Sequence, residues 1–396
     1  MTDFAATKAQ FHIPEGVIYL DGNSLGPMPH GAVARAEAVI REEWAEMLIT
    51  AWNRADWMGL PARVGDRIAP LIGAAPGSVT MGDTLSIKVF QAVSAALKLT
   101  DRKVVLSDSG NFPTDLYMAD GLLKALGPEY ELRVVAPEAV EAAITEEVAV
   151  TMLTEVDYRT GRRHDMARLT AKVHEAGALA VWDLAHSAGA FAVDLDGCGA
   201  EFAVGCTYKY LNGGPGAPAF IYVRPDLADS VEPILAGWLG HEAPFAFDLD
   251  YRPAPGVSRM RVGTPPVVQL SILEEALKIW EGVDMAALRA ASVALCERFI
   301  AGVEAACEGV RLVSPRDAYV RGSQVSFAHP KGYEAMQALI ARGVIGDFRA
   351  PDVMRFGFTP LYIGEAEVDR AVEIMAEVFA RRLYDDPAYA VRSAVT

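Results

Sequence analysis

Residues 178–216 read ALAVWDLAHSAGAFAVDLDGCGAEFAVGCTYKYLNGGPG, and two short apolar runs in this stretch each end in polar residues. The first run ends at Asp183, and the second is followed by Tyr208 and Lys209. Short apolar runs with polar ends are typical of buried strands. Ligands of α/β proteins bind at the carboxyl ends of such strands. We therefore expect Asp183 and Lys209 to lie close together at one edge of a sheet.

The surrounding sequence alternates between strand-like and helix-like segments. Strand-like runs at 103–108, 130–136 and 148–154 are separated by helix-like stretches, and 218–224 has the pattern of a strand that runs back against the others. This alternation predicts a mainly parallel sheet flanked by helices, in the α/β class. After residue 283 the pattern changes to helices mixed with short strands, which predicts a smaller α+β domain.

We divide the chain into three parts on this basis. They are an N-terminal segment that packs with the small domain, a large domain and a small C-terminal domain, at residues 1–50, 51–285 and 286–396. Within the first part, apolar residues recur at spacings of three and four, which places them on one face of an amphipathic helix. These residues are Val33, Ala36, Ile40, Trp44 and Met47.

The composition excludes several classes of protein. The chain has 36 Lys and Arg against 52 Asp and Glu, a net charge of −16, which opposes binding to nucleic acids and to anionic membranes. The sequence lacks an apolar run of about 18 residues, so we expect no membrane span and no membrane partner. The four cysteines form no Cys-x-x-Cys pair, which predicts no metal and fits a reducing cytoplasm.

Residues 22–26, GNSLG, match the G-x-S-x-G pattern of serine hydrolases. That pattern requires a strand before the serine and a helix after it. Only one strand-like run precedes it here, and Pro27 and Pro29 disfavour helix in the residues before them. A plain turn is therefore the favoured interpretation. The sequence also lacks G-x-G-x-x-G, any Gly-Lys pair and H-E-x-x-H, which argues against dinucleotide, P-loop and zinc-protease sites.

A lysine amine among aromatic residues loses hydration, so its pKa falls and it can form a Schiff base with an aldehyde. Pyridoxal phosphate (PLP) needs such an amine, an acid facing its ring nitrogen and donors for its phosphate. Lys209 and Asp183 supply the first two. A helix-capping aspartate and a solvated lysine would produce the same residues, so both interpretations stay open at this point.

Residues 83–87, DTLSI, begin a helix-like stretch whose free N–H groups could bind a phosphate, with Thr84 and Ser86 as hydroxyl donors. An ordinary capped helix would have the same pattern. Further along, Phe112 in the loop NFPTD could stack on a flat ring, or it could be a residue of the core or rim.

Several motifs in one order carry a resemblance to a known family: YLDGNSLGP, FPTD, DLAHSAGA, YKYLNGGPG, Trp238 and GTPP. Together they resemble the kynureninases, bacterial type, which are fold-type-I PLP enzymes of the aminotransferase superfamily. The similarity runs from about residue 17 to about residue 364. It implies an aminotransferase-like fold with a mainly parallel seven-stranded sheet and a smaller α+β C-terminal domain.

The resemblance also implies roles for single residues. Lys209 would carry the cofactor, Asp183 would face the pyridinium nitrogen, and Phe112 would stack on the ring. Residues expected beside the ring are His186 and Asp115, with Thr154 as a nearby hydroxyl. The phosphate would be held by Thr84, Leu85, Tyr208 and Trp238. Thr264 would reach the phosphate of a partner subunit, which implies a homodimer with shared active sites, and Arg355 would bind the substrate carboxylate.

The implied reaction is hydrolysis of L-kynurenine to anthranilate and L-alanine in tryptophan degradation, with Tyr208 as a candidate to activate the water. Animal members carry a His and an Asn where this chain has Asn53 or a neighbour and Thr264, which favours L-kynurenine over 3-hydroxykynurenine. Trp52, Trp57 and Phe112 are expected near the aromatic ketone. Three alternatives stay open: a cysteine desulfurase-like lyase, a broader β-carbon hydrolase or lyase, and a non-catalytic ligand-binding protein.

Overall fold

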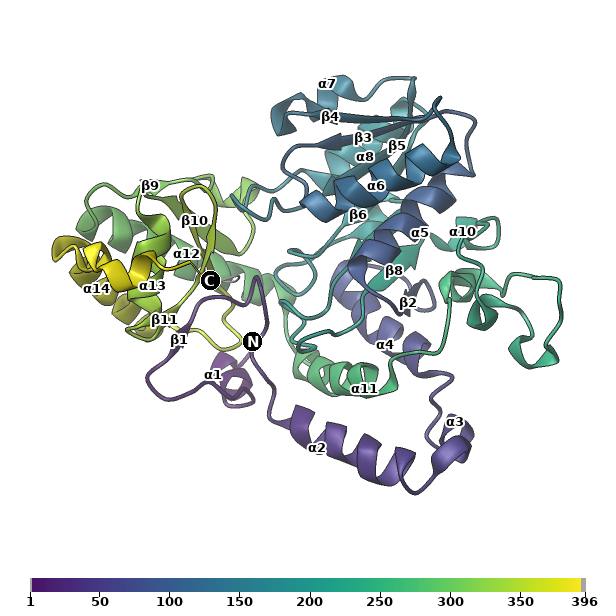
Figure 1. Cartoon of the computed structure of the whole chain (residues 1–396), viewed down its shortest axis with the longest axis horizontal. Helices are drawn as coiled ribbons and strands as arrows, with labels where there is room; N and C mark the ends of the chain where they lie inside the picture. Colours follow the sequence, from purple (N-terminus) through teal and green to yellow (C-terminus); the bar gives the residue numbers. More distant parts are fainter. Residues whose placement is uncertain (1, 393–396) are drawn as a thin grey trace.

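The computed structural model of the chain describes residues 2–392, so residues 393–396 of the expected small domain lie outside the described part. Two lobes are visible in Figure 1, one built on a large twisted sheet and one, green to yellow, on a small sheet. The strands are β1 (Ile18–Tyr19), β2 (Val79–Met81), β3 (Val104–Asp108), β4 (Glu131–Val135), β5 (Val148–Thr154), β6 (Leu179–Asp183), β7 (Phe202–Gly205), β8 (Phe220–Val223), β9 (Arg311–Leu312), β10 (Gln324–Ala328), β11 (Val344–Ile345), β12 (Asp347–Arg349) and β13 (Val353–Gly357).

The large sheet has the expected seven strands, and their order is β2-β8-β7-β6-β5-β3-β4. Neighbouring strands from β7 through β4 are parallel, whereas β8 runs antiparallel to both β7 and β2. The prediction of a strand turned back at 218–224 is therefore confirmed. All residues of β5 and β7 are buried, since helices cover both faces of a parallel sheet and leave no wet side.

The helices are α1 (Phe4–Lys8), α2 (Gly31–Ala38), α3 (Ala51–Arg54), α4 (Leu60–Ile68), α5 (Leu85–Leu97), α6 (Pro113–Leu126), α7 (Val140–Ala143), α8 (Met166–Glu175), α9 (Leu195–Cys198), α10 (Pro225–Ala228), α11 (Val267–Ala276), α12 (Met285–Ala306), α13 (Gly332–Ile340) and α14 (Glu365–Ala380). Helices α5 and α6 lie side by side on one face of the large sheet (Figure 1). Within residues 2–392, no helix is long and apolar enough to cross a bilayer.

The small lobe contains a four-stranded antiparallel sheet in the order β12-β13-β10-β9, packed with α12, α13 and α14. This arrangement confirms the expected α+β character of the C-terminal part. The N-terminal strand β1 pairs in parallel with β11 of this lobe. The chain therefore starts against the small lobe before it enters the large one, which brings residues 21–24 close to β12 and β13.

The amphipathic segment near the N-terminus differs from a regular helix. Helix α2 ends at Ala38 and continues as one π-helical turn, Val39–Trp44. The apolar face predicted from spacing is largely exposed, with Val33 at 56%, Ile40 at 45% and Trp44 at 62%. These three side chains therefore lie outside the core formed by residues 2–392, although α2 itself lies along α11 (Figure 1).

Candidate active site

A cavity of about 190 Å³ lies where the carboxyl ends of β5, β6 and β7 meet the first turns of α5 and α6. Most of the residues expected at the site line it. They are Leu85, Phe112, Asp115, Thr154, Asp183, His186, Tyr208, Lys209 and Arg355. The parallel register explains the convergence, because Thr154 of β5 pairs directly with Asp183 of β6. Chain segments more than 200 residues apart thus meet at one edge of the sheet, as strand ends in this class do.

The Lys209 amine lies 2.9 Å from Nε2 of His186. Burial, reinforced by the positive charge of Lys209, holds the pKa of His186 well below its usual range. The imidazole is therefore neutral and its Nε2 accepts a hydrogen bond from the amine. This contact fixes the end of a flexible side chain and leaves the amine directed at the cavity.

Two carboxyl groups lie beside this amine. Asp183 is buried and its Oδ1 accepts a hydrogen bond of 2.8 Å from the backbone N–H of Ala185. Burial and the adjacent Asp183 raise the pKa of Asp115 well above its usual range. Burial also raises the pKa of Asp183, but Lys209 opposes that shift. The pair therefore holds one proton on Asp115 and one negative charge on Asp183, which suits a neighbouring cation such as a protonated ring nitrogen.

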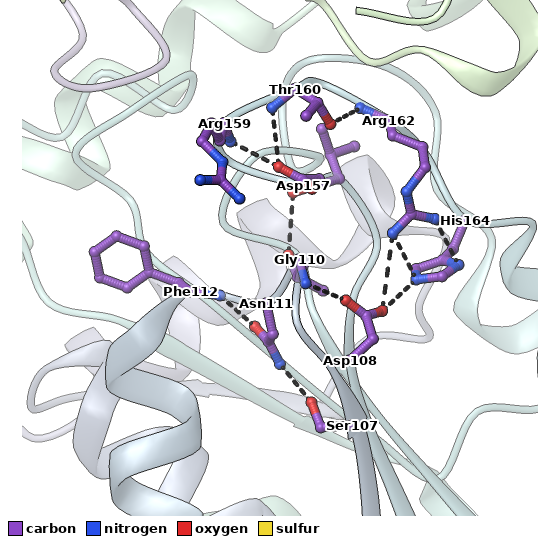
Figure 2. A network of polar contacts seen from close by, with 12 residues as sticks. Ser107, Asp108, Gly110, Asn111, Phe112, Asp157, Arg159, Thr160, Arg162 and His164 are labelled. Atoms are coloured by element: carbon purple, nitrogen blue, oxygen red, sulfur yellow. Dashed lines mark hydrogen bonds and ion pairs between the residues drawn. The ribbon is translucent and has the colours of Figure 1, made fainter. Parts of the chain in front are cut away.

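A polar network fixes the loop between β3 and α6 (Figure 2). The carboxylate of Asp108, at the end of β3, accepts from the backbone N–H of Gly110 at 2.6 Å and lies 2.6 Å from Nε2 of His164. The guanidinium of Arg162 lies against the same imidazole, with both Nη atoms 3.1 Å from its ring nitrogens. Asp108 and His164 are buried, so this loop is tied to the end of the sheet.

The same loop positions Phe112. The side-chain Oδ1 of Asn111 accepts from the N–H of Phe112 at 2.7 Å, and its Nδ2 donates to Ser107 at 3.2 Å (Figure 2). The Phe112 ring packs edge-on against Tyr158, with centroids 5.1 Å apart, and is 42% exposed. One aromatic face is therefore available at the cavity, where a flat ring could stack.

The anion-binding end of the cavity is the start of α5. Thr84 is the N-cap residue, is exposed, and forms no capping hydrogen bond with its side chain, while Leu85 and Ser86 line the cavity. A feature that the sequence did not indicate lies directly beneath. Lys88 is fully buried, donates to Gln91 and to the carbonyl of Met260 at 2.8 and 3.2 Å, and has a pKa lowered by burial to about 8.

Arg355 lines the cavity but is held by its own chain. It lies on β13 directly opposite Asp347 on β12, and its Nε and Nη2 donate to the two carboxylate oxygens of Asp347. Its Nη2 also donates to Ser24 at 3.0 Å, and its Nη1 donates to the carbonyl of Tyr158. This ion pair could not be predicted from the sequence, because Asp347 belongs to a different strand.

The turn at residues 21–24 also reaches the cavity, although the sequence favoured a plain turn. Asn23 is fully buried and lines the cavity, and within residues 2–392 neither atom of its amide has a hydrogen-bond partner. Ser24 is used in the charge network of Asp347 and Arg355 rather than as a hydrolase nucleophile. The GNSLG motif itself was the signal for these residues, but only the pairing of β1 with β11 shows where they lie.

Several expected residues lie outside the cavity. Trp238 is 39% exposed and packs edge-on against Trp52, which in turn packs against Trp57. Thr264 is exposed beside a separate small hollow that Asp83 also lines. Thr84 is at the rim, one residue before Leu85. A single chain therefore does not bring these side chains together with Lys209.

The residues that meet in the cavity fit PLP. The cavity offers an amine for the aldehyde, a carboxylate for the ring nitrogen, an aromatic face and a helix N-terminus for the phosphate, with the buried, unpaired amide of Asn23 as a further polar group for a ligand.

Known proteins are similar in sequence to this chain along almost all of its length. A family profile described as the kynureninase C-terminal domain matches residues 288–375. The kynureninases of Burkholderia pseudomallei (strain 1106a) and of Pseudomonas fluorescens are each 51% identical to the chain over 400 residues, which cover 99% of this chain and 96% of each relative. The chain belongs to the kynureninase family. The predicted family membership is thus confirmed.

Solved structures of more distant proteins show the fold. A cysteine desulfurase from Thermococcus onnurineus NA1 matches with a TM-score of 0.81 at 18% identity, covering 96% of this chain and 99% of its own. A C-DES variant with glycine linked to its PLP cofactor matches with a TM-score of 0.80 at 18% identity, covering 95% of this chain and 100% of its own. The family therefore shares its fold with these enzymes, and the aminotransferase-like prediction is confirmed.

The desulfurase alternative is not favoured. Its nucleophile would be an accessible cysteine with a lowered pKa. Here burial raises the pKa of all four thiols, and the Cys307 thiol, at the end of α12, has a pKa of about 12. The identity to named kynureninases points the same way.

Proposed function

We propose that this protein uses PLP to hydrolyse L-kynurenine, with one water, to anthranilate and L-alanine. The observation that carries the proposal is 51% identity to kynureninases over 99% of the chain. The cavity supports it chemically, because the amine of Lys209 and the carboxylate of Asp183 meet there. The enzyme would thus break a carbon–carbon bond next to a ketone. The retained amine and carboxylate argue against a non-catalytic binding protein.

When bound, PLP would withdraw electrons from the carbon atoms of the substrate. A few residues of the protein would bind the cofactor and the substrate and transfer the protons. Lys209 would bind the cofactor and then move the proton of the substrate α-carbon. Asp183 would keep the ring nitrogen protonated, and Phe112 would hold the ring plane. Arg355 would bind the α-carboxylate and orient the substrate, which places the ketone at the opposite end of the cavity.

Tyr208 is better suited to donate a proton than to remove one. The adjacent Cys206 and burial raise the pKa of Tyr208 far above its usual range, so the phenol keeps its proton at neutral pH. We therefore assign it to hydrogen-bond donation toward the phosphate, together with Thr84, Leu85 and Ser86. The raised pKa argues against Tyr208 as the base that activates water. Thr154, whose hydroxyl donates to the carbonyl of Val156, would lie beside the cofactor.

We also propose a homodimer with shared active sites. The exposed apolar face of α2 and the following turn borders a groove of about 560 Å³, lined by residues of α2, α11 and the 213–215 bend. An exposed apolar surface of this kind marks an association site. Trp238 and Thr264 lie outside the cavity of their own chain, so a second copy could complete the phosphate site. Trp52 and Trp57 pack in one cluster with Trp238, so a partner whose site Trp238 completes would receive these rings as well.

The proposal is tested by incubating the holoenzyme with L-kynurenine, 3-hydroxykynurenine and L-cysteine, and following anthranilate fluorescence, alanine and released sulfide. We expect L-kynurenine to have the highest kcat/KM and 3-hydroxykynurenine to react more slowly. Release of sulfide from cysteine without cleavage of either kynurenine would overturn the proposed reaction. A preference for 3-hydroxykynurenine would overturn only the interpretation of residues 53 and 264.

A further inference from the structure

The contacts of Arg355 leave it little capacity to bind a ligand. An arginine has five N–H hydrogens. Nε donates one to Asp347 at 2.6 Å, Nη2 donates to Asp347 and to Ser24, and Nη1 donates to the carbonyl of Tyr158. One hydrogen, on Nη1, is left. Firm binding of a carboxylate by arginine uses two parallel N–H groups. Arg355 in this position therefore supplies only half of such a site.

A second guanidinium lies beside the first. Arg349 and Asp347 are two residues apart on β12, so their side chains leave the same face of the strand. The Nη2 of Arg349 lies 2.8 Å from Asp347 and 3.4 Å from the hydroxyl of Ser24, and its Nη1 donates to the carbonyl of Phe348 at 2.8 Å. Arg349 lines the same cavity as Arg355. Its Nε and one hydrogen of Nη1 have no partner among residues 2–392.

The charges around the two arginines favour an anion. Arg349 and Arg355 share the single carboxylate of Asp347. The other nearby acid is Asp21, whose pKa is raised to about 8 by burial and by Asp347, so it is largely neutral at pH 7. The cluster thus carries one net positive charge toward the cavity. A guanidinium that is already oriented by a carboxylate loses little side-chain entropy when it binds a ligand.

We propose that Arg349 is a second substrate-binding residue, which completes with Arg355 the site for the α-carboxylate of the substrate. Asp347 holds the two guanidinium groups side by side, which leaves, among residues 2–392, one free N–H on Arg355 and two on Arg349. The inference rests on the proposed function only in that the substrate is an α-amino acid.

The test is a titration of the holoenzyme with L-alanine, which has the α-carboxylate, and with ethylamine, which lacks it, followed by the absorption of the bound cofactor. The variants are Arg349→Gln and Arg349→Lys. We expect Arg349→Gln to weaken the binding of L-alanine about 10- to 100-fold and to leave the binding of ethylamine unchanged. The reason is that only the carboxylate of alanine loses a charged hydrogen bond. Arg349→Lys should recover part of the loss, because it keeps the charge but not the planar fork.

A matched control is Arg298→Gln. Arg298 also forms a two-point ion pair with an aspartate, Asp369, but on the exposed surface between α12 and α14. The Arg298→Gln variant should bind both L-alanine and ethylamine with the wild-type affinity. The proposal would be overturned if Arg349→Gln bound L-alanine as tightly as the wild-type enzyme does, or if its affinity for ethylamine fell by the same factor as its affinity for L-alanine. Because neither ligand is kynurenine, the result is informative whichever substrate the enzyme cleaves. With L-kynurenine as substrate, Arg349→Gln should raise KM by about the same factor as it weakens the binding of L-alanine, and should keep kcat within about threefold of the wild-type value.

Discussion

Lys209 lines the cavity, whereas Lys88 lies in the first turn of α5 and does not line it, and the surroundings of the two lysines separate their roles. Lys209 is partly exposed to the cavity, and its amine lies against the neutral His186 and over the ring of Tyr208. Lys88 is fully buried and its amine is occupied by Gln91, Met260 and Asp83. A lowered pKa alone would favour Lys88 as the nucleophile, whereas access to the cavity favours Lys209.

Borohydride reduction of the holoenzyme should therefore attach the cofactor to Lys209, and Lys209→Ala should abolish the adduct and the activity. Peptide mass mapping locates the modified residue. Lys88→Met should still form the adduct on Lys209, since the Lys88 amine does not face the cavity. An adduct on Lys88 in the wild-type enzyme would contradict the assignment.

Asp21 predicts a pH dependence of stability. Its pKa is about 8 in the folded protein against an ordinary value of 3.8, because burial and Asp347 disfavour the charged form. The folded state therefore holds a proton that the unfolded chain releases, so stability is complete below about pH 4 and falls as the pH rises toward 8. The slope from one such proton is at most about 1.4 kcal/mol per pH unit.

Asp21→Asn cannot ionise, so the free energy of unfolding of this variant should fall less steeply between pH 5 and pH 8 than that of the wild type. Urea unfolding at several pH values measures both slopes. Asp369→Asn is the control, because its pKa is lowered by Arg298 and it does not titrate in this range. Parallel slopes for wild type and Asp21→Asn would show that Asp21 is ionised in the folded protein.

Single residues differ in how far the sequence reveals them. Asp183 and Lys209 could be predicted, because a strand end and a charged group after an apolar run are both visible locally. Asp347 and Arg349 could not, because their contact with Arg355 depends on the pairing of two short strands, β12 and β13. Asn23 could not, because its place depends on the pairing of β1 with β11, which joins residues more than 300 positions apart. Ser24 was visible only as part of a misleading motif.

The loop between β3 and α6 is the element whose conformation decides where Phe112 lies. His164→Ala would remove one hydrogen-bond partner of a fully buried carboxylate, Asp108, at a cost of about 1.5–3 kcal/mol. We expect the loop to loosen, the visible circular dichroism of the bound cofactor to weaken, and kcat/KM to fall about tenfold.

His174→Ala is the matched control for this prediction. His174 also pairs with a buried carboxylate, Glu201, at 2.9 Å, but it belongs to α8 and not to the polar network that holds the loop of Phe112. Its removal should leave the cofactor signal unchanged. If both variants alter the signal equally, the effect is general destabilisation rather than misplacement of Phe112.

Elements with a strong apolar pattern were predictable, including the strands β3 to β7 of the large sheet and the reversed strand β8. The three-residue strand β2 was not predicted, because it is too short to show a pattern. The π-helical turn after α2 was not, because apolar residues spaced by three and four fit a regular helix as well. The pairing of β1 with β11 was also hidden, since two-residue strands have no periodicity. Because of that pairing, Asn23 and Ser24, which are near the N-terminus of the chain, lie at the cavity.

At the scale of the whole molecule, the homodimer can be tested by mixing two inactive variants, Lys209→Ala and Thr264→Asp. If Thr264 acts across the interface, half of the randomly formed dimers are mixed, and each mixed dimer has one site with both native residues. The expected activity is about a quarter of the wild-type value. Light scattering should show dimers throughout. No recovery on mixing, or an active monomer, would contradict shared sites.

The central claim is that the protein hydrolyses the bond between the side-chain ketone and the β-carbon of L-kynurenine. The most direct measurement is turnover in water labelled with ¹⁸O, with both products analysed by mass spectrometry. Hydrolysis of this bond should give anthranilate and alanine in equal amounts, with one oxygen of the anthranilate carboxylate taken from water at the cleavage step and no label from that step in alanine. Anthranilate that acquires no label from water, or alanine absent from the products, would contradict the claim.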